Sequence, residues 1–320
     1  MLAYVIRRLV QMIPIVLAVA LLIFIMFSVI PGTFASSLGN DGRGTVDAQV
    51  AARMTKELGL DDPVHVRFGR ADPFPARLGR YSGQGATFAL GVSFRTRQSV
   101  LRTIGEAAGP TLKLAGASML FAIVVGVPLG FLAAARPGSW LDTGSMIVAV
   151  SGLSVPKFWL GLIMMYVFAL KLGWFPSFGY GDGVRNLVLP ALALGTSPMA
   201  LLARTTRAAT LEIMNADFVR TARSKGMSEG KVVRWHLARN ALVIVLTTVG
   251  LQVGSVIGQA VVIEKLFAWP GVGSLLVDSV TLRDIPVVQG CILVIVLFFL
   301  FVNLLVDIMC AVIDPRIKYT

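Results

Sequence analysis

The chain has 320 residues, of which 56% are hydrophobic and 14% charged, whereas a soluble domain carries roughly 25% charged residues. With a mean hydropathy of +0.78, this composition excludes an ordinary soluble domain and indicates an integral membrane protein. The net charge of +12 does not indicate nucleic-acid binding, because the basic residues flank apolar runs instead of forming one patch interleaved with aromatics.

Six apolar segments follow one another along the chain, each near the roughly 17–25 residues that a helix needs to cross a bilayer. They cover residues 9–30, 109–135, 143–170, 187–202, 241–263 and 286–313. The first follows Arg7 and Arg8 and is too long for the core of a cleaved signal, so we expect it to remain as a helix. The fourth is short, and we expect it to continue as a helix beyond the membrane, carrying Arg204 and Arg207.

The basic residues predict the orientation of these helices. With both ends in the cytoplasm, the cytoplasmic ends and connections hold thirteen Lys and Arg residues, against four in the short connections on the other side. The loop 31–108 is basic too, but loops longer than about 60 residues cross the membrane largely regardless of charge. We therefore predict an all-α membrane protein with about six transmembrane helices and both termini inside.

Prolines and a lysine interrupt the apolar segments. Pro128, Pro156, Pro190 and Pro198 are expected to kink helices or to let them approach closely. Lys157 follows Pro156 near the middle of the third segment, where a lipid-facing lysine would cost about 2.5–3.5 kcal/mol. We predict that it faces protein or water: it either lines a cavity and favours anionic groups such as a carboxylate, or pairs with a buried acid of a partner subunit.

A basic, mostly polar stretch, residues 217–241, lies between the fourth and fifth apolar segments. Asn215 or Asp217 can cap a first short helix, Gly226 can end it, and Ser228 can cap a second. Ala222 and Gly226 are four residues apart, so on a helix they share a face that another backbone can approach closely. The stretch is either a plain cytoplasmic loop that fixes orientation or a contact site for another protein.

Two stretches on the predicted outer side carry further patterns. Glu264 is followed by Pro270, Gly271 and Gly273, which predict a tight, partly buried turn near the outer end of the fifth apolar segment. In the long loop 31–108, residues 57–63 read ELGLDDP. Residues 69–89 contain prolines and glycines without a helical period.

These motifs resemble one family when taken in order. The family is that of the permease subunits of ABC importers in the dipeptide, oligopeptide and nickel group. The segments that resemble it are DFVRTARSKGM with the residues from His236 to Ala241, the turn after Glu264, residues 57–63 and the terminal IDPRIKY. Residues 69–89 depart from the pattern of that group, which has an amphipathic helix there. The resemblance implies the type I ABC-importer fold and a coupling loop, the EAA loop, that sits in a groove of an ATPase. The coupling residues it implies are Asp217, Arg220, Thr221, Ala222, Lys225, Gly226, Met227 and Ser228.

The resemblance also implies the partners and the division of the chain. The partners are a second homologous permease subunit, two ABC ATPases that use ATP and magnesium, and a periplasmic or lipid-anchored substrate-binding protein, all at the bacterial inner membrane. The divisions are 1–30 for the first helix, 31–108 for the external loop, 109–314 for the transmembrane core with the coupling loop 215–241, and 315–320 for the tail. Peptides are the expected solute; nickel chelates, glutathione or another small solute are the alternatives.

Catalytic and metal-binding patterns are weak in this sequence. The nearest match to a phosphate-binding loop, GMSEGKV at 226–232, is one residue too short and lacks the hydroxyl residue that would bind magnesium. The two histidines and two cysteines show no metal-ligand spacing. An ion-coupled carrier is the competing class, but among the six spans the only candidate ion relays are Asp307, near the cytoplasmic end of the sixth, and Glu264, at the outer edge of the fifth. We therefore expect no enzyme activity, no metal and no cofactor on this chain.

Overall fold

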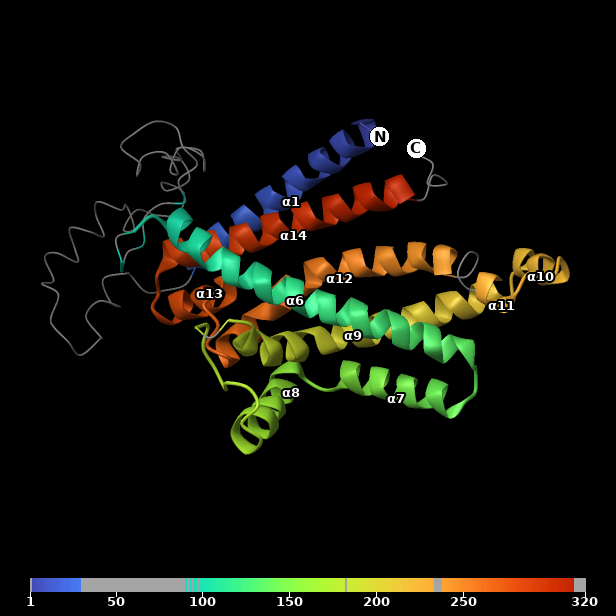
Figure 1. Ribbon diagram of the computed structural model, residues 1–320. Coiled ribbons are helices and arrows are strands. Elements are labelled where there is room, and N and C mark those ends of the chain that lie inside the picture. The colour runs from blue at the N-terminus through green and yellow to red at the C-terminus, as the bar shows by residue number, and fades with distance from the viewer. Residues whose placement is uncertain are drawn as a thin grey trace, which may run out of the picture. The chain divides into compact units, whose positions relative to one another are not determined.

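The structure, a computed structural model, describes residues 2–29, 90, 93, 95, 96, 98–181, 183–232 and 238–313. Helices make up nearly all of this part of the chain (Figure 1). They are α1 (Leu2–Val29), α6 (Val100–Ala135), α7 (Trp140–Ser154), α8 (Lys157–Met164), the π-helix η1 (Met165–Lys171), α9 (Val184–Met214), α10 (Asp217–Ser224), α11 (Glu229–Lys231), α12 (Ala238–Leu266), α13 (Val272–Thr281) and α14 (Ile285–Ile313). The all-α prediction is confirmed. The predictions for residues 31–89, His236 and the tail 315–320 lie outside the described residues.

Helices of the structure coincide with all six predicted apolar segments. Four are long and apolar enough to cross a membrane: α6, α9, α12 and α14. Taken together, α7 and the helical stretch of α8 and η1 are also long and apolar enough to form a fifth span, which is bent. The multi-pass character is thereby confirmed, while the sixth span, which would be α1, and the orientation stay predictions. The fourth segment does continue as one helix past Arg204 and Arg207, as expected.

Only one of the four interrupting prolines coincides with a break between helices. Pro128, Pro190 and Pro198 lie inside continuous helices. At Pro156 the chain bends by 107° between α7 and α8, because Val155 adopts the extended conformation that a following proline favours (φ −79°, ψ 126°). The third predicted segment is therefore two helices at a steep angle.

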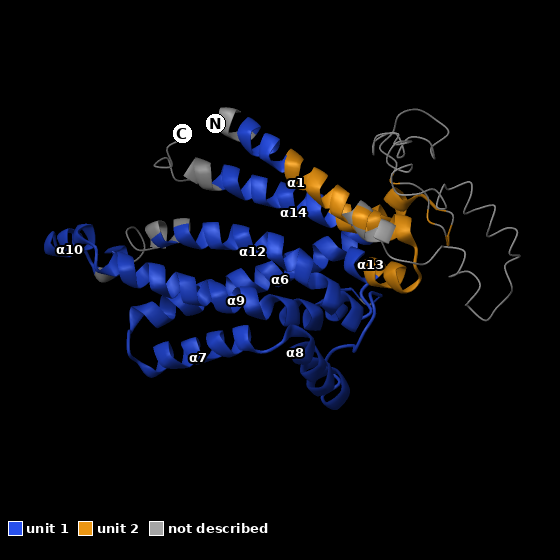
Figure 2. Cartoon of the chain, turned by 180° about the vertical axis from the view of Figure 1, so that it is seen from behind, with its two compact units in different colours: residues 1–12, 107–274, 295–320 blue, residues 13–106, 275–294 orange. Residues whose placement is uncertain are grey.

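The chain divides into two compact units, which are described separately (Figure 2). Unit 1 holds residues 1–12, 107–274 and 295–320, and unit 2 holds residues 13–106 and 275–294. The core of unit 1 lies between α6, α9 and α12, where residues such as Leu114, Leu194 and Ile263 are fully buried. A second cluster joins α7 to the same three helices through Ala149.

Glycines bring α6 and α9 together in unit 1. A Cβ atom at Gly126 would lie 2.5 Å from the carbonyl oxygen of Met199, and one at Gly130 would lie 2.5 Å from that of Ala203. Both distances are far below van der Waals contact, so these two positions have no room for a side chain. Between membrane helices, association depends on such close packing because lipid is as apolar as the side chains.

In unit 2, a buried hydrogen bond joins the end of the predicted external loop to the start of α14. The Ser93 hydroxyl donates to a carboxylate oxygen of Asp284 at 2.5 Å. The same hydroxyl oxygen accepts from the backbone N–H of Thr96 at 2.9 Å. Asp284 directly precedes α14, and the Val288 N–H donates to its carbonyl oxygen at 3.0 Å. This network fixes Ser93 and Thr96 beside the turn between α13 and α14.

Candidate functional site

The predicted helix, glycine turn and second helix are present in the coupling loop (α10 and α11; Figure 1). The turn is a Schellman motif: the Gly226 N–H donates to Arg223 O at 2.9 Å and the Met227 N–H donates to Ala222 O at 3.3 Å. Gly226 has φ +78°, the left-handed conformation that only glycine adopts without a steric penalty. The sequence from Ala222 to Met227 therefore dictates a rigid turn.

Two details of the predicted loop are wrong. The residue at the cap position of α10 is Ala216, without a side-chain hydrogen bond, whereas Asn215 ends α9 and its amide donates to Leu211 O. Ala222 and Gly226 do not share an open helix face either, because α10 ends at Ser224 before Gly226 is reached. Ser228 does directly precede α11, and the Val232 N–H donates to its carbonyl oxygen at 3.1 Å.

Ala222 points into the loop's own small core. It is 6% exposed and packs with the fully buried Val219 and Val232. Ile213 and Met214 at the end of α9 pack against the same cluster, together with Met227. The sequence gives a reason, since Val219 and Ala222 are three residues apart and face the same side of α10. The loop is thus attached to the end of α9 by an apolar cluster.

The other predicted coupling residues lie on the surface of the loop. The exposed ones are Asp217, Arg220, Thr221, Lys225, Gly226 and Ser228, and Met227 is half-buried. Phe218 is 45% exposed among them, and sequence reasoning missed it. An aromatic side chain on a short, otherwise polar helix is the signal that could have found it, because large exposed aromatics are common at protein interfaces.

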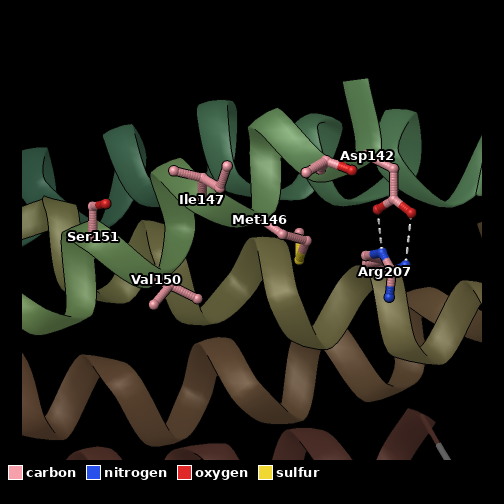
Figure 3. Close-up of a pocket in the computed structure, with 7 residues that line it drawn as sticks. Asp142, Met146, Ile147, Val150, Ser151 and Arg207 are labelled. Atoms are coloured by element: carbon pink, nitrogen blue, oxygen red, sulfur yellow. Dashed lines mark hydrogen bonds and ion pairs between the residues drawn. The ribbon is translucent and has the colours of Figure 1, made fainter. Parts of the chain in front are cut away.

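A second polar site joins α7 to α9 and was also missed (Figure 3). Arg207 donates through Nε to Asp142 Oδ1 at 2.5 Å and through Nη2 to Oδ2 at 2.7 Å. Asp142 is 4% exposed and also accepts from the backbone N–H of Gly138 at 2.9 Å. The pair closes one end of an open groove whose apolar lining includes Met146 and Val150. Arg207 follows the apolar part of α9 by a few residues, and this position was the signal that could have found the pair, since a charge there is stabilised by a partner.

Lys157 is the first residue of α8, directly after the bend. Its Nζ atom is buried and has no hydrogen-bond partner within the described part of the chain. Pro156 occupies the cap position of α8 and supplies no side-chain hydrogen bond, so the first backbone N–H groups of this helix also lack a side-chain cap. The bend thus combines an ammonium group with the positive end of a helix.

The turn around Pro270, Gly271 and Gly273 is partly buried, as predicted, because both glycines are buried while Pro270 is exposed, and Glu264 lies at its centre. Glu264 is 0% exposed. Its carboxylate accepts from the Thr111 hydroxyl of α6 at 2.6 Å and from the Ser274 N–H at the start of α13 at 3.0 Å. A Cβ atom at Gly273 would lie 2.5 Å from Val261 Cα, which explains why this position carries no side chain. The carboxylate therefore caps α13 and joins it to α6.

These elements define a class of protein. This all-helical membrane bundle, in which a long helix leads into an exposed basic helix and turn, shares its fold with chains of solved ABC transporters. A chain of the MetNI methionine ABC transporter, in inward-facing conformations, aligns with 67% of this chain and 98% of its own length, with TM-score 0.57 and 20% identity. A chain of an amino acid ABC transporter determined with histidines gives TM-score 0.51 at 15% identity, covering 68% of this chain and 95% of that one.

The family follows from the sequence match. The chain belongs to the family of binding-protein-dependent transport system inner membrane components, whose model matches residues 126–319, with the N-terminal model of the same systems matching residues 1–115. It is thus a multi-pass inner-membrane permease subunit of an ABC importer, and ATP is hydrolysed by separate subunits.

Curated relatives match over the whole chain. The dipeptide transport system permease protein DppB of Alkalihalophilus pseudofirmus is 36% identical over 346 residues, covering 100% of both chains. The glutathione transport system permease protein GsiC of Escherichia coli K12 is 40% identical over 319 residues, again covering 100% of both. The GsiC of Salmonella typhi matches at the same 40% identity and coverage.

Proposed function

We propose that this chain forms one half of the translocation path of a peptide importer, with six membrane spans and both termini in the cytoplasm. A second, homologous permease subunit supplies the other half. Two ATPases that use ATP and magnesium bind on the cytoplasmic side, one of them at the coupling loop of this chain, and a periplasmic or lipid-anchored binding protein delivers the solute. The full-length similarity to a dipeptide permease supports the peptide assignment.

The geometry of the coupling loop is the observation that carries this proposal. The loop is rigid, because its turn is closed by two hydrogen bonds and its apolar side faces the end of α9. It exposes Arg220 and Lys225 together with Phe218. A rigid, cationic surface with an aromatic at its edge suits a docking role better than the role of a passive connection.

Gly226 permits a matched test of this docking. Its Cβ position has open space and its φ is +78°, and Gly173, which follows η1, has open space and a φ of +64°. Asparagine tolerates this conformation better than most residues, so Gly226→Asn and Gly173→Asn carry a similar backbone penalty. We expect Gly226→Asn to weaken co-purification of the ATPases and to lower ATP-driven uptake, whereas Gly173→Asn retains both.

The comparison can contradict the assignment. Gly226→Arg adds a bulkier, charged side chain at the same position and should abolish coupling while the membrane helices still assemble. If Gly226→Arg and Gly226→Asn both bind the ATPases and transport at the rate of the unmodified chain, the coupling loop is not the docking site.

Lys157 is proposed to line the translocation cavity and to favour the carboxylate of a peptide. A buried ammonium group without a partner is costly unless an anion or water reaches it. The uncapped start of α8 adds partial positive charge in the same place. The competing role is an ion pair with an acid of the second permease subunit, which would occupy the ammonium permanently.

Uptake of two forms of one peptide distinguishes these roles. Lys157→Met should lower uptake of the peptide with a free carboxylate more than uptake of its C-terminally amidated form. Lys113→Met is the control, because Lys113 lies on α6 and donates to the Tyr180 hydroxyl at 2.8 Å in an exposed position. Equal losses for both peptides in Lys157→Met would remove the carboxylate role and favour the ion pair.

Glutathione is the second candidate solute, because glutathione permeases match the full length at 40% identity. It is itself a small peptide with two carboxylates, so it also suits a cavity with a lysine. Competition decides: we expect dipeptides to inhibit uptake of a labelled dipeptide in the reconstituted complex more strongly than glutathione does. Stronger inhibition by glutathione than by dipeptides would instead assign glutathione as the solute.

The acids of the apolar helices support ATP-driven over ion-coupled transport. Asp307 on α14 lies 3.3 Å from the guanidinium of Arg8 on α1. Glu264 and Asp142 are held by the contacts described above. Each of these carboxylates therefore has a structural partner. Uptake with ATP and a collapsed ion gradient should proceed at the normal rate, and abolition of uptake would contradict the ATP-driven assignment.

A further inference from the structure

The ion pair between Asp142 and Arg207 lies where α7 begins, on the side of unit 1 where α9 leads to the coupling loop (Figure 1). Both oxygens of the carboxylate and two nitrogens of the guanidinium take part, so the pair fixes direction as well as distance (Figure 3). The Asp142 backbone N–H also donates to the side chain of Ser139, the cap of α7. A movement of Arg207 is thus transmitted to the first turn of α7.

The other end of α7 is attached to α9 as well. The Ser197 hydroxyl donates to Gly152 O at 3.3 Å. A Cβ atom at Gly152 would lie only 3.0 Å from Thr196 Cγ2, so the two helices are in close contact there. Gly152 precedes the bend at Pro156 by one helical turn. Since α7 is fixed at its start and near its end, it follows α9 as a unit.

The coupling loop is connected to α9 without a flexible joint. The helix α9 runs unbroken to Met214, and α10 begins at Asp217. Across this short connection, Ile213 and Met214 pack against Val219 and Ala222. A displacement of the loop must therefore displace the end of α9, and Arg207 lies two turns before that end.

We infer that Asp142 and Arg207 are positioning residues that transmit a movement of the coupling loop to the bend between α7 and α8, where Lys157 lies. This rests on the proposed function, in which ATPases move the loop. A bidentate pair suits the task, because it resists sliding and rotation of α7 along α9, whereas apolar contacts alone permit small slips. The pair places the bend without itself touching the solute.

The test follows two positions within one complex. In a chain whose Cys291 and Cys310 are replaced by Ser, an environment-sensitive fluorophore is attached either at Glu212→Cys, exposed near the end of α9, or at Phe158→Cys, exposed just after the bend. The permease pair, the ATPases and the binding protein are assembled in nanodiscs, and a non-hydrolysable ATP analogue with magnesium is added. We expect both labels to respond in the otherwise unmodified chain.

Substitution of either partner should separate the two responses. In Arg207→Lys, which retains the charge but not the bidentate geometry, and in Asp142→Asn, the label at position 212 should still respond while the label at 158 loses most of its response. The control is Arg185→Lys, because Arg185 donates to Trp174 O in an exposed position. In that variant both responses should persist.

Each outcome bears on the inference. If the label at 158 responds fully in both variants, the transmitting role is wrong. If neither label responds in the otherwise unmodified chain, the proposed coupling function fails and the inference fails with it. If in that same chain the label at 212 responds and the label at 158 does not, only the inference is refuted. Should the single variants not assemble, Asp142→Leu with Arg207→Met removes both charges and leaves none unpaired. A full response at 158 in that double variant would also overturn the inference.

Discussion

The buried carboxylate of Glu264 allows a quantitative prediction about the predicted outer end of the bundle. Its replacement by alanine removes an acceptor that serves the Thr111 hydroxyl and the Ser274 N–H. A buried donor that loses its partner costs about 1–3 kcal/mol. The two losses together therefore cost about 2 kcal/mol or more, and an internal cavity adds to the loss.

Glu264→Gln should reduce the stability of the folded chain far less than Glu264→Ala does, because the neighbouring groups can form new hydrogen bonds. The glutamine amide oxygen can accept from the Ser274 N–H, and its amide nitrogen can donate to Thr111 Oγ1. The Thr111 hydroxyl then turns to Ala107 O, which lies 3.4 Å away, and its oxygen still accepts from the Val272 N–H at 2.8 Å. We expect Glu264→Gln to cost about 1 kcal/mol, the contribution of one ordinary hydrogen bond.

Thermal unfolding in detergent, followed by tryptophan fluorescence, measures these differences. Trp269 is 2% exposed beside the site and donates to Pro110 O at 2.9 Å, so it reports on this region directly. Glu264→Ala should lower the midpoint by roughly 5 °C or more. Glu106→Ala is the control, because that acid pairs with Arg102 on the surface, where such pairs contribute about 0–1 kcal/mol. Equal midpoints for Glu264→Ala and the control would refute the capping argument.

Three further predictions concern single positions. Ala268 and Arg283 adopt φ values of +50° and +54°. Replacing either residue by glycine should raise the unfolding midpoint, since it relieves about 1 kcal/mol of backbone strain. Unchanged or lower midpoints in Ala268→Gly and Arg283→Gly would contradict this. Ser93→Ala should lower the midpoint, because Asp284 loses a buried donor; protease cleavage between residues 93 and 98 should become faster. Gly130→Val should prevent assembly of α6 with α9 and remove the protein from the membrane fraction, whereas Gly116→Val, with open space, should not.

Much of the fold could be predicted because it depends on patterns local in sequence. The lengths of the apolar segments predicted the helices, and Gly226 predicted the end of α10, since a glycine after a short helix favours the left-handed turn. The bend at Pro156 was open to prediction for the same reason, although Pro128, Pro190 and Pro198 carry the same signal without breaking a helix. What distinguishes Pro156 is the packing around it: Gly152 and Gly161 place α7 against α9 and α8 against Leu266, and this is a property of the tertiary structure.

The polar contacts between helices could not be predicted, for a physical reason. A hydropathy pattern says how many charges an apolar segment contains, but the partner of each depends on helix rotation and on the angle at which two helices cross. The third apolar segment, placed at 143–170, excluded Asp142 by one residue, and so Arg207 was left without its acid. The orientation of Ala222 was wrong for a related reason, since small residues favour close approach equally well by a neighbouring protein or by the chain's own Val219 and Val232. In a membrane bundle the apolar positions specify the helices, and the few buried polar groups specify how those helices are joined.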